Sequence, residues 1–472
     1  MVSNGTRKQR HAATNNETAF IRQEDAPILP PPITSSGPAG WLYENIFASM
    51  LDFSTLGAAV KSILMAIFTA FVAYIFVGQV YGLLDFAIFS AVWQDPEEQK
   101  RQVCWTVEQG GKLPNGWHGA CWPYIIAKTK FILYGAYPNE SLWRVNSTYL
   151  LGAILLGWVM IDRLPYRKFV GAVLLTIYPI FATVMLTGGG FGLSQFSVGV
   201  NTIVGLALIS FGRAGKMGWI TGPLLDLSKV AGVAGWFFIF FAAALVSVGV
   251  DFDLSKVDTR DWGGLLITLV VATTAIVVSL PLGILLALGR RSNLPVARTL
   301  SIIFIEFWRG VPLITVLFMA SVMIPLFMPE GVNFDSLLRA LIGVTLWQSA
   351  YMAEVIRGGL QAIDKGQYEG ADAVGLSYWQ SMRLIILPQA LTRVLPGIVN
   401  TIISVFKDTS LVSIVGLFDL LGATQSTIAD AAWSTPVQAS TGYLVVALIF
   451  FVFCFGMSRY SMYIERKLDR GH

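Results

Sequence analysis

A carboxylate and a guanidinium lie three residues apart in the apolar run FIEFWRGVPLITVLF. At that spacing Glu306 and Arg309 share one face of a helix, and charge inside a membrane segment is costly unless it is paired or reaches water. Two interpretations stay open. The pair neutralises itself and packs a helix bundle, or it lines a cavity that meets the amine and carboxylate of a small zwitterion. Gly310 and Pro312 loosen the backbone just beyond, which suits a broken helix beside a transport pathway.

A second charged group lies in the run FKDTSLVSIVG. Lys407 and Asp408 are adjacent, so they point away from each other on a helix and do not simply neutralise one another. Thr409 and Ser410 add hydroxyls directly after them. We therefore expect partners for these charges on another helix, such as the first charged pair, or a water-filled cavity.

A third pair, Glu354 and Arg357, closes the run SLLRALIGVTLWQSAYMAEVIRGG. We expect this pair near the cytoplasmic end of a span. A charged pair at that depth is more simply interpreted as an interfacial contact than as part of a transport pathway.

Several kinds of chemistry are missing from the sequence. The run GRAGKMG at 212–218 has the wrong spacing for a phosphate-binding loop and lacks the hydroxyl after Lys216. The chain also lacks a nucleophile elbow, an HExxH motif and a redox cysteine pair, and its three histidines are scattered. We therefore expect no catalytic residue, no metal site and no cofactor bound by this chain.

The elements that position these residues must be membrane helices. The chain is 54% hydrophobic and 13% charged, with a mean hydropathy of +0.62, whereas soluble domains carry about 25% charged residues. We predict an all-α, polytopic helical membrane protein with about ten spans, or eight to ten if the short run 196–211 is re-entrant. It would contact lipid and no nucleic acid. The predicted spans are 57–84, 148–162, 169–187, 196–211, 231–250, 262–288, 299–327, 335–356, 394–418 and 441–458.

Basic residues indicate how these spans are oriented. With the N-terminus inside, about 21 Lys and Arg residues fall on predicted cytoplasmic segments and about 8 on periplasmic ones, as the positive-inside rule requires. Clusters such as DRLPYRK, GRRSNLPVAR and RYSMYIERKLDR lie on that side. Both termini are therefore expected in the cytoplasm.

The chain divides near residue 250. We expect a disordered cytoplasmic tail over 1–55 and a transmembrane extension over 56–250, with a periplasmic segment at about 85–147. Cys104 and Cys121 lie in that segment, where they either form a disulfide or remain two unrelated thiols. Cys454 lies in a span and is most simply a packing residue.

The segment YEGADAVGLSYWQSMRLIILP, residues 368–388, is too polar and too short to span a bilayer. We predict a helix on the cytoplasmic membrane face. Small residues at Gly370, Ala371 and Ala373 would let another protein approach closely, Glu369 offers a charge for a specific contact, and Gly375 permits a turn with positive φ. The pattern indicates a docking surface.

This segment resembles the EAA signature of ABC importer permeases, E-A-A-x3-G-x9-I-x-L-P. Gly370 replaces the usual alanine, which lowers helix propensity by about 1 kcal/mol. Over about 255–465, runs such as EFWRGVPLI and KDTSLVSIVGL are similar to the polar amino-acid subgroup of that family. The long N-terminal half resembles the extended permease of proteobacterial importers for glutamate, glutamine, aspartate and asparagine, or for amino acids in general. The residues at the positions of the signature are Glu369, Gly370, Ala371, Gly375, Ile385, Leu387 and Pro388.

The resemblance implies a five-helix type I importer core over 251–465, a coupling helix at about 366–388 and a cytoplasmic tail at 466–472. It implies import of L-amino acids, polar, acidic or broad in range, from periplasm to cytoplasm across a bacterial inner membrane by alternating access. The implied partners are a cytoplasmic ATPase dimer that carries ATP and Mg, a second related permease in a heterodimer, and a periplasmic amino-acid-binding protein. The expected ATPase-coupling residues are Glu369, Gly370, Ala371, Asp372 and Gly375. Our wider hypothesis for the substrate pathway comprises Glu306, Arg309, Lys407, Asp408, Thr409 and Ser410.

An ion-coupled secondary transporter is the alternative. It would also contain intramembrane charges and kinked helices, but it should show internal repeats and would have no use for a docking segment. We find no convincing repeat between the two halves. A membrane enzyme is less favoured, because no nucleophile, metal or acid–base group is recognisable.

Overall fold

The computed structural model describes residues 56–94, 102–190, 195–218, 223–328, 335–433 and 435–469. The predicted N-terminal tail and the last three residues therefore lie outside the described residues. The described part is helical, with isolated β-bridges and no strand, which confirms the all-α fold class. It divides into two units, Met1–Asp85 and Phe86–His472.

The described part of the first unit is one long apolar helix, α3 (Leu56–Leu84). Its 29 residues rise about 43 Å at about 1.5 Å each, which is enough to cross the hydrocarbon core of a bilayer. Large apolar side chains such as Ile67, Phe71 and Phe76 are exposed along it. Exposure on all sides is typical of a helix surrounded by lipid.

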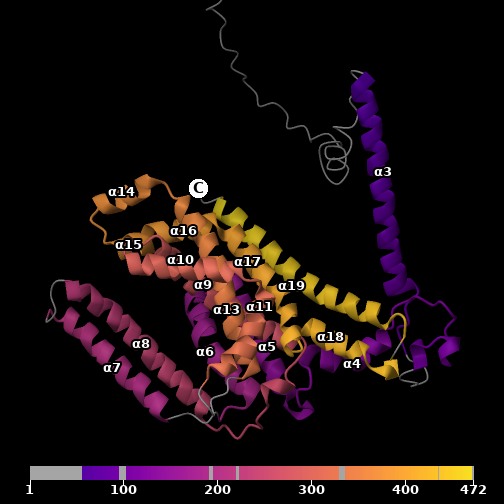
Figure 1. The fold of residues 1–472 in the computed structure, drawn as a ribbon, viewed down its shortest axis with the longest axis horizontal. Helices are drawn as coiled ribbons and strands as arrows, with labels where there is room; N and C mark the ends of the chain where they lie inside the picture. The colour runs from indigo at the N-terminus through magenta and orange to yellow at the C-terminus, as the bar shows by residue number, and fades with distance from the viewer. Residues whose placement is uncertain are drawn as a thin grey trace, which may run out of the picture. The chain divides into compact units, whose positions relative to one another are not determined.

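Two helical hairpins form most of the extension in the second unit. The helices α5 (Leu142–Met160) and α6 (Arg167–Thr187) pack on each other. The helices α7 (Gln195–Lys216) and α8 (Pro223–Gly249) lie side by side (Figure 1). Glycine permits this close approach, because a Cβ on Gly212 would lie 2.5 Å from the Cα of Gly232.

The helices α9 (Leu265–Arg290) and α13 (Ser336–Gln361) pack together at the centre of the remaining part (Figure 1). At Gly283 a Cβ would lie 2.8 Å from the Cβ of Met352, so only glycine allows this packing. Around the pair are α10 (Pro295–Gly310), α11 (Leu313–Phe318), α12 (Ile324–Leu326), α17 (Leu395–Asp408), α18 (Leu420–Ile428) and α19 (Gln438–Asp469). Their shared apolar core includes Leu266, Val271, Leu317, Val344 and Val405.

All ten predicted spans contain helix. By length and composition, seven helices among the described residues could cross a membrane, or eight if α10 with α11 and α12, bent by 104°, counts as one span. The bend follows Gly310 and Pro312, as expected for a broken helix. The run 196–211 lies within α7 (Gln195–Lys216), and all but its first two residues belong to the candidate span Val198–Lys216. The helices α5 and α13 are not among the candidate spans.

Candidate functional site

Five charged side chains from three helices form one cluster, which we call the arginine–glutamate cluster. It comprises Arg290 of α9, Glu306 and Arg309 of α10, and Glu354 and Arg357 of α13. The end of α9 and the end of α10 meet α13 here, so Arg290 and Glu354, which are 64 positions apart in the sequence, lie in contact.

Glu354 is the centre of the cluster. Its side chain is 14% exposed and accepts hydrogen bonds from Arg290 at 2.9 Å and Arg357 at 2.8 Å. It also forms a looser ion pair with Arg309 at 3.6 Å. The Nε atom of Arg357 also donates to Oε1 at 3.1 Å while its Nη2 atom donates to Oε2 at 2.8 Å, so this pair has two parallel contacts. Such fork-shaped contacts are the strong form of an arginine–carboxylate pair.

In the structure the first sequence pair is joined to other helices rather than to itself. Glu306 pairs with Arg290 at 2.9 Å and Arg309 with Glu354, so each is joined to a different helix. The sequence identified the shared face of the two residues but not their partners, because the partners come from helices distant in the sequence. Arg290 was recognised only as a topology marker and Glu354 only as an interfacial residue. Their charge at a helix end was the available signal for both.

The cluster carries an excess of one positive charge, since three arginines meet two glutamates. Arg309 is the arginine most open to a further ligand. Its side chain is 37% exposed, against 24% for Arg290 and 29% for Arg357. It also lies over the ring of Tyr351, 5.8 Å from the centroid. A carboxylate could approach Arg309 without breaking the stronger pairs.

The second charged group is not joined to the first. Lys407 is exposed and Asp408 half-buried at the end of α17, and within the described part of the chain neither takes part in an ion pair. Thr409 is buried and donates to the carbonyl of Phe406 at 2.8 Å. Ser410 is half-buried. Among the described residues, the expected partner on the first charged pair is thus not found.

The predicted coupling segment is a helix, a turn and a second helical stretch. It comprises α14 (Lys365–Ala373), α15 (Tyr378–Ser381), a π-helical turn at Met382–Ile386 and α16 (Leu387–Arg393). Gly375 has a φ of 76°, as predicted, and its N–H donates to the carbonyl of Asp372 at 2.9 Å. The left-handed glycine ends α14 and turns the chain back.

The side chains of α14 point in two directions. Glu369, Gly370 and Asp372 are exposed, whereas Ala371 is buried against the rest of the chain. Ala371 therefore packs α14 onto its own molecule, and we do not expect it to contact another protein directly. The segment is further attached by Gln389, which donates to Gln367 at 2.9 Å, and by Arg393, which bonds to the carbonyl of Ala362.

Far from α14 in the sequence, a disulfide joins Cys104 and Cys121, which decides between the alternatives left open by spacing alone. The following helix, α4 (Trp122–Tyr134), is fastened to α18 and to the residues just after it. Lys128 pairs with Asp430 at 2.6 Å, and the hydroxyls of Tyr124 and Thr427 lie 2.6 Å apart. We call residues 86–134 the disulfide module.

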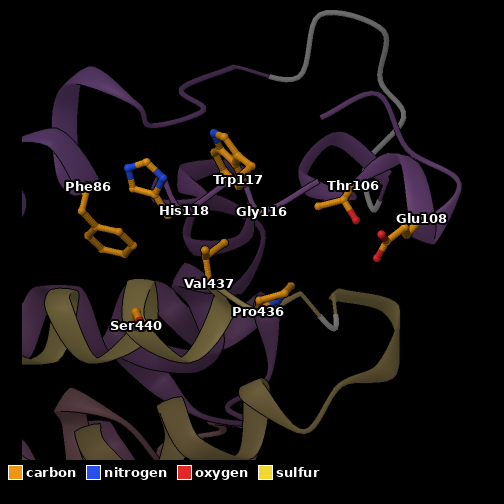
Figure 2. Close-up of a pocket in the computed structure, with 9 residues that line it drawn as sticks. All are labelled: Phe86, Thr106, Glu108, Gly116, Trp117, His118, Pro436, Val437 and Ser440. Atoms are coloured by element: carbon orange, nitrogen blue, oxygen red, sulfur yellow. The ribbon is translucent and has the colours of Figure 1, made fainter. Parts of the chain in front are cut away.

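A pocket of about 570 Å³ opens between the disulfide module and the first turn of α19. Figure 2 shows Trp117 and His118 on one side of it and Pro436, Val437 and Ser440 on the other. None of the sequence-predicted site residues lines this pocket. The described residues contain no group of histidine, cysteine and acidic side chains that could hold a metal ion.

Comparisons with known proteins agree over most of the chain. A family model for the inner membrane component of binding-protein-dependent transport systems matches residues 279–470. The chain is 45% identical to the inner membrane amino-acid ABC transporter permease protein YhdY of Escherichia coli, over 75% of this chain and 79% of that protein. It is 40% identical to the glutamate/glutamine/aspartate/asparagine transport system permease protein BztC of Rhodobacter capsulatus, over 97% of this chain and 100% of that protein. Among solved structures, it is similar to a chain in a crystal structure of an amino acid ABC transporter with histidines, at 29% identity and a TM-score of 0.39, over 43% of this chain and 92% of that chain.

Proposed function

The chain belongs to the family of amino-acid ABC transporter permeases, and on that premise we propose that it imports glutamate, glutamine, aspartate and asparagine. As a member it is a transmembrane subunit of a binding-protein-dependent amino-acid importer in the inner membrane. Family membership favours this function over the alternative of an ion-coupled secondary transporter. ATP and Mg are then handled by a partner ATPase, while this chain supplies the pathway.

The substrate class rests on two observations. BztC, a permease named for these four amino acids, aligns with this chain over its whole length, so the similarity includes the extension as well as the core. The arginine–glutamate cluster also carries excess positive charge, with Arg309 as its most exposed arginine. A cation there suits the α-carboxylate of any amino acid and the second carboxylate of an acidic one.

A surface for the ATPase is proposed on α14 and its turn. The observation that carries this role is the exposure of Glu369, Gly370 and Asp372 on one short helix whose other side, at Ala371, is packed on the core. The ATPase can therefore bind the exposed side of α14, while the buried side transmits the movement of α14 to the core. Gly375 holds the turn that presents this helix.

Lys407 supports the proposal of a second permease in a heterodimer. It lies in α17, within the candidate span Leu395–Val415, and is exposed. A bare ammonium facing lipid at this depth is costly. A neighbouring permease or a water-filled path between two permeases would remove that cost, and Lys407, Asp408, Thr409 and Ser410 would then face the substrate pathway together with Glu306 and Arg309.

Competition for uptake tests the substrate class. The complete complex, with its binding protein and ATPase, is reconstituted in vesicles, and ATP-dependent uptake of labelled glutamate is measured against each unlabelled amino acid. We expect glutamate, glutamine, aspartate and asparagine to compete, and lysine and leucine to compete weakly. Competition by lysine alone would contradict the proposed substrates, and uptake driven by an ion gradient without ATP would contradict the proposed energy source.

A further inference from the structure

Two consecutive arginines end α9 and contact different parts of the molecule. Arg290 pairs with Glu306 and Glu354 in the arginine–glutamate cluster, both at 2.9 Å. Arg291 reaches instead to the coupling segment. Its Nη1 atom donates to the carbonyl of Leu360 at 2.7 Å and to the hydroxyl of Tyr368 at 3.1 Å. The sequence of this GRR run indicates only the membrane orientation. In the structure each arginine has its own partners: Arg290 contacts the arginine–glutamate cluster and Arg291 contacts Leu360 and Tyr368.

The Leu360 carbonyl is the point where three helices meet. It belongs to the last turn of α13, whose carbonyls lack partners within the helix. Two donors satisfy it: Arg291 from the end of α9, and the hydroxyl of Tyr368 in α14, at 3.1 Å. The cation also suits the negative end of the helix dipole.

The ring of Tyr368 adds a second contact with the same arginine. The guanidinium of Arg291 lies over this ring, 5.6 Å from its centroid. Tyr368 is half-buried and packs against an apolar cluster that includes Met352, Ile356 and Ile386. Tyr368 immediately precedes the exposed Glu369 in the sequence. Glu369 is therefore available to a partner, while Tyr368 is held by Arg291 at the end of α9 and by Leu360 of α13.

We propose that Arg291 and Tyr368 are positioning residues that transmit movement of α14 to the arginine–glutamate cluster. A displacement of α14 would pull on Arg291 through the hydroxyl and ring of Tyr368, and would disturb the Leu360 carbonyl of α13 that both residues share. Arg290 is the next residue back along the chain, so that displacement strains its two ion pairs with Glu306 and Glu354. The inference rests on the proposed function, because it assumes that the ATPase moves α14.

Two conservative substitutions test the transmission. Tyr368→Phe removes the hydroxyl and keeps the ring, and Arg291→Lys keeps the charge but loses the planar fork. Each variant is reconstituted as the complete complex with its binding protein, and ATP hydrolysis and amino-acid uptake are measured on the same vesicles. We expect hydrolysis to continue, while the number of amino acids imported per ATP falls about tenfold, as the loss of a charged hydrogen bond predicts.

The double variant shows whether both residues act through one contact. If they do, Arg291→Lys combined with Tyr368→Phe lowers uptake per ATP no further than the stronger single variant. Arg298→Lys and Tyr443→Phe are matched controls. Both residues are exposed, and no hydrogen bond or ion pair of either side chain is found within the described part of the chain. Both controls should keep the wild-type ratio.

Two results would overturn the inference: a wild-type ratio in both single variants, or an equal loss of hydrolysis and uptake with loss of the ATPase from the complex. The second result would indicate a structural role only. Failure of the proposed function has a different signature. In that case Glu369→Lys would retain the ATPase and full uptake, irrespective of the ratio measured for Tyr368→Phe.

Discussion

Glu354 is the single side chain on which the arginine–glutamate cluster depends. It pairs with three arginines and is largely buried, whereas Glu306 is 54% exposed and pairs with one. Removing a carboxylate from a buried charge network leaves its cations uncompensated, which costs more than the net value of the pairs themselves.

We therefore predict that Glu354→Gln destabilises the protein by about 3 kcal/mol, while Glu306→Gln, as its control, costs less than about 1 kcal/mol. Thermal unfolding of both variants in detergent measures the difference. Equal losses would contradict the central place of Glu354.

Asp162 lies in the loop after α5 and contacts the end of α19. It therefore connects the N-terminal extension to the core of the second unit. Lys467 at 2.7 Å and the hydroxyl of Tyr463 at 2.8 Å contact its carboxylate. The hydrogen bond from Lys467, followed by the one from Tyr463, lowers the pKa of Asp162 from 3.8 to about 2. Because the pKa is lower in the folded protein, the carboxylate stabilises the fold at pH values above its pKa in the unfolded chain. This contribution disappears as the pH falls from about 4 to about 2.

We predict that Asp162→Asn lowers the midpoint of thermal unfolding at pH 7, and that the difference from wild type shrinks below about pH 4. Thermal unfolding at stepped pH values is the measurement. A difference that stays constant, or grows, as the pH falls would show that the carboxylate does not act through its charge.

At the scale of elements, the coupling segment depends on a turn that only glycine adopts without strain. Gly375 has a φ of 76°, whereas Gly370 lies inside α14 with open space where a Cβ would be. The two glycines of one segment therefore differ in what they contribute.

We predict that Gly375→Val costs about 1 to 2 kcal/mol locally, misplaces α14 and abolishes uptake. Gly370→Ala, the matched control, should stabilise α14 by about 0.5 to 1 kcal/mol and leave uptake intact. Uptake in vesicles and limited proteolysis near residue 375 measure both effects. Normal uptake by Gly375→Val would contradict the role given to the turn.

Local patterns were sufficient to predict the helices, the break after Gly310 and the turn at Gly375, because periodicity and backbone preference are properties of neighbouring residues. They could not predict the partners of Glu306 and Arg309. Those partners, Arg290 and Glu354, are set by how three helices pack. The burial of Ala371 also depends on tertiary packing, and the cysteine pairing required the geometry of the folded chain.

At the scale of the whole molecule, α9 connects the two functional ends of the second unit. At its start, the N–H of Gly264 donates to the carbonyl of Phe418 at 2.7 Å, and Gly264 packs against α4 of the disulfide module. At its end, Arg291 reaches the coupling segment. Its 26 residues span about 39 Å, which is long enough to place these ends on opposite sides of a membrane. A disulfide forms in an oxidising compartment, which supports a periplasmic module and a cytoplasmic α14.

We predict that a membrane-impermeant maleimide labels Val107→Cys in intact spheroplasts and labels Val374→Cys only after permeabilisation. Both valines are exposed, at 61% and 77%, and Cys454 is replaced by serine in the background so that no other free thiol reacts. The reverse pattern of labelling would invert the proposed orientation and place both termini outside.

The most direct test of the account is whether the ATPase binds through α14. Glu369→Lys reverses the charge on its exposed face, and Glu140→Lys makes the same change on an exposed residue outside the coupling segment. The ATPase that co-purifies with each membrane-inserted permease is measured together with ATP-dependent uptake. The account predicts that Glu369→Lys loses both the ATPase and uptake while Glu140→Lys keeps both. Normal ATPase association and normal uptake by Glu369→Lys would contradict it.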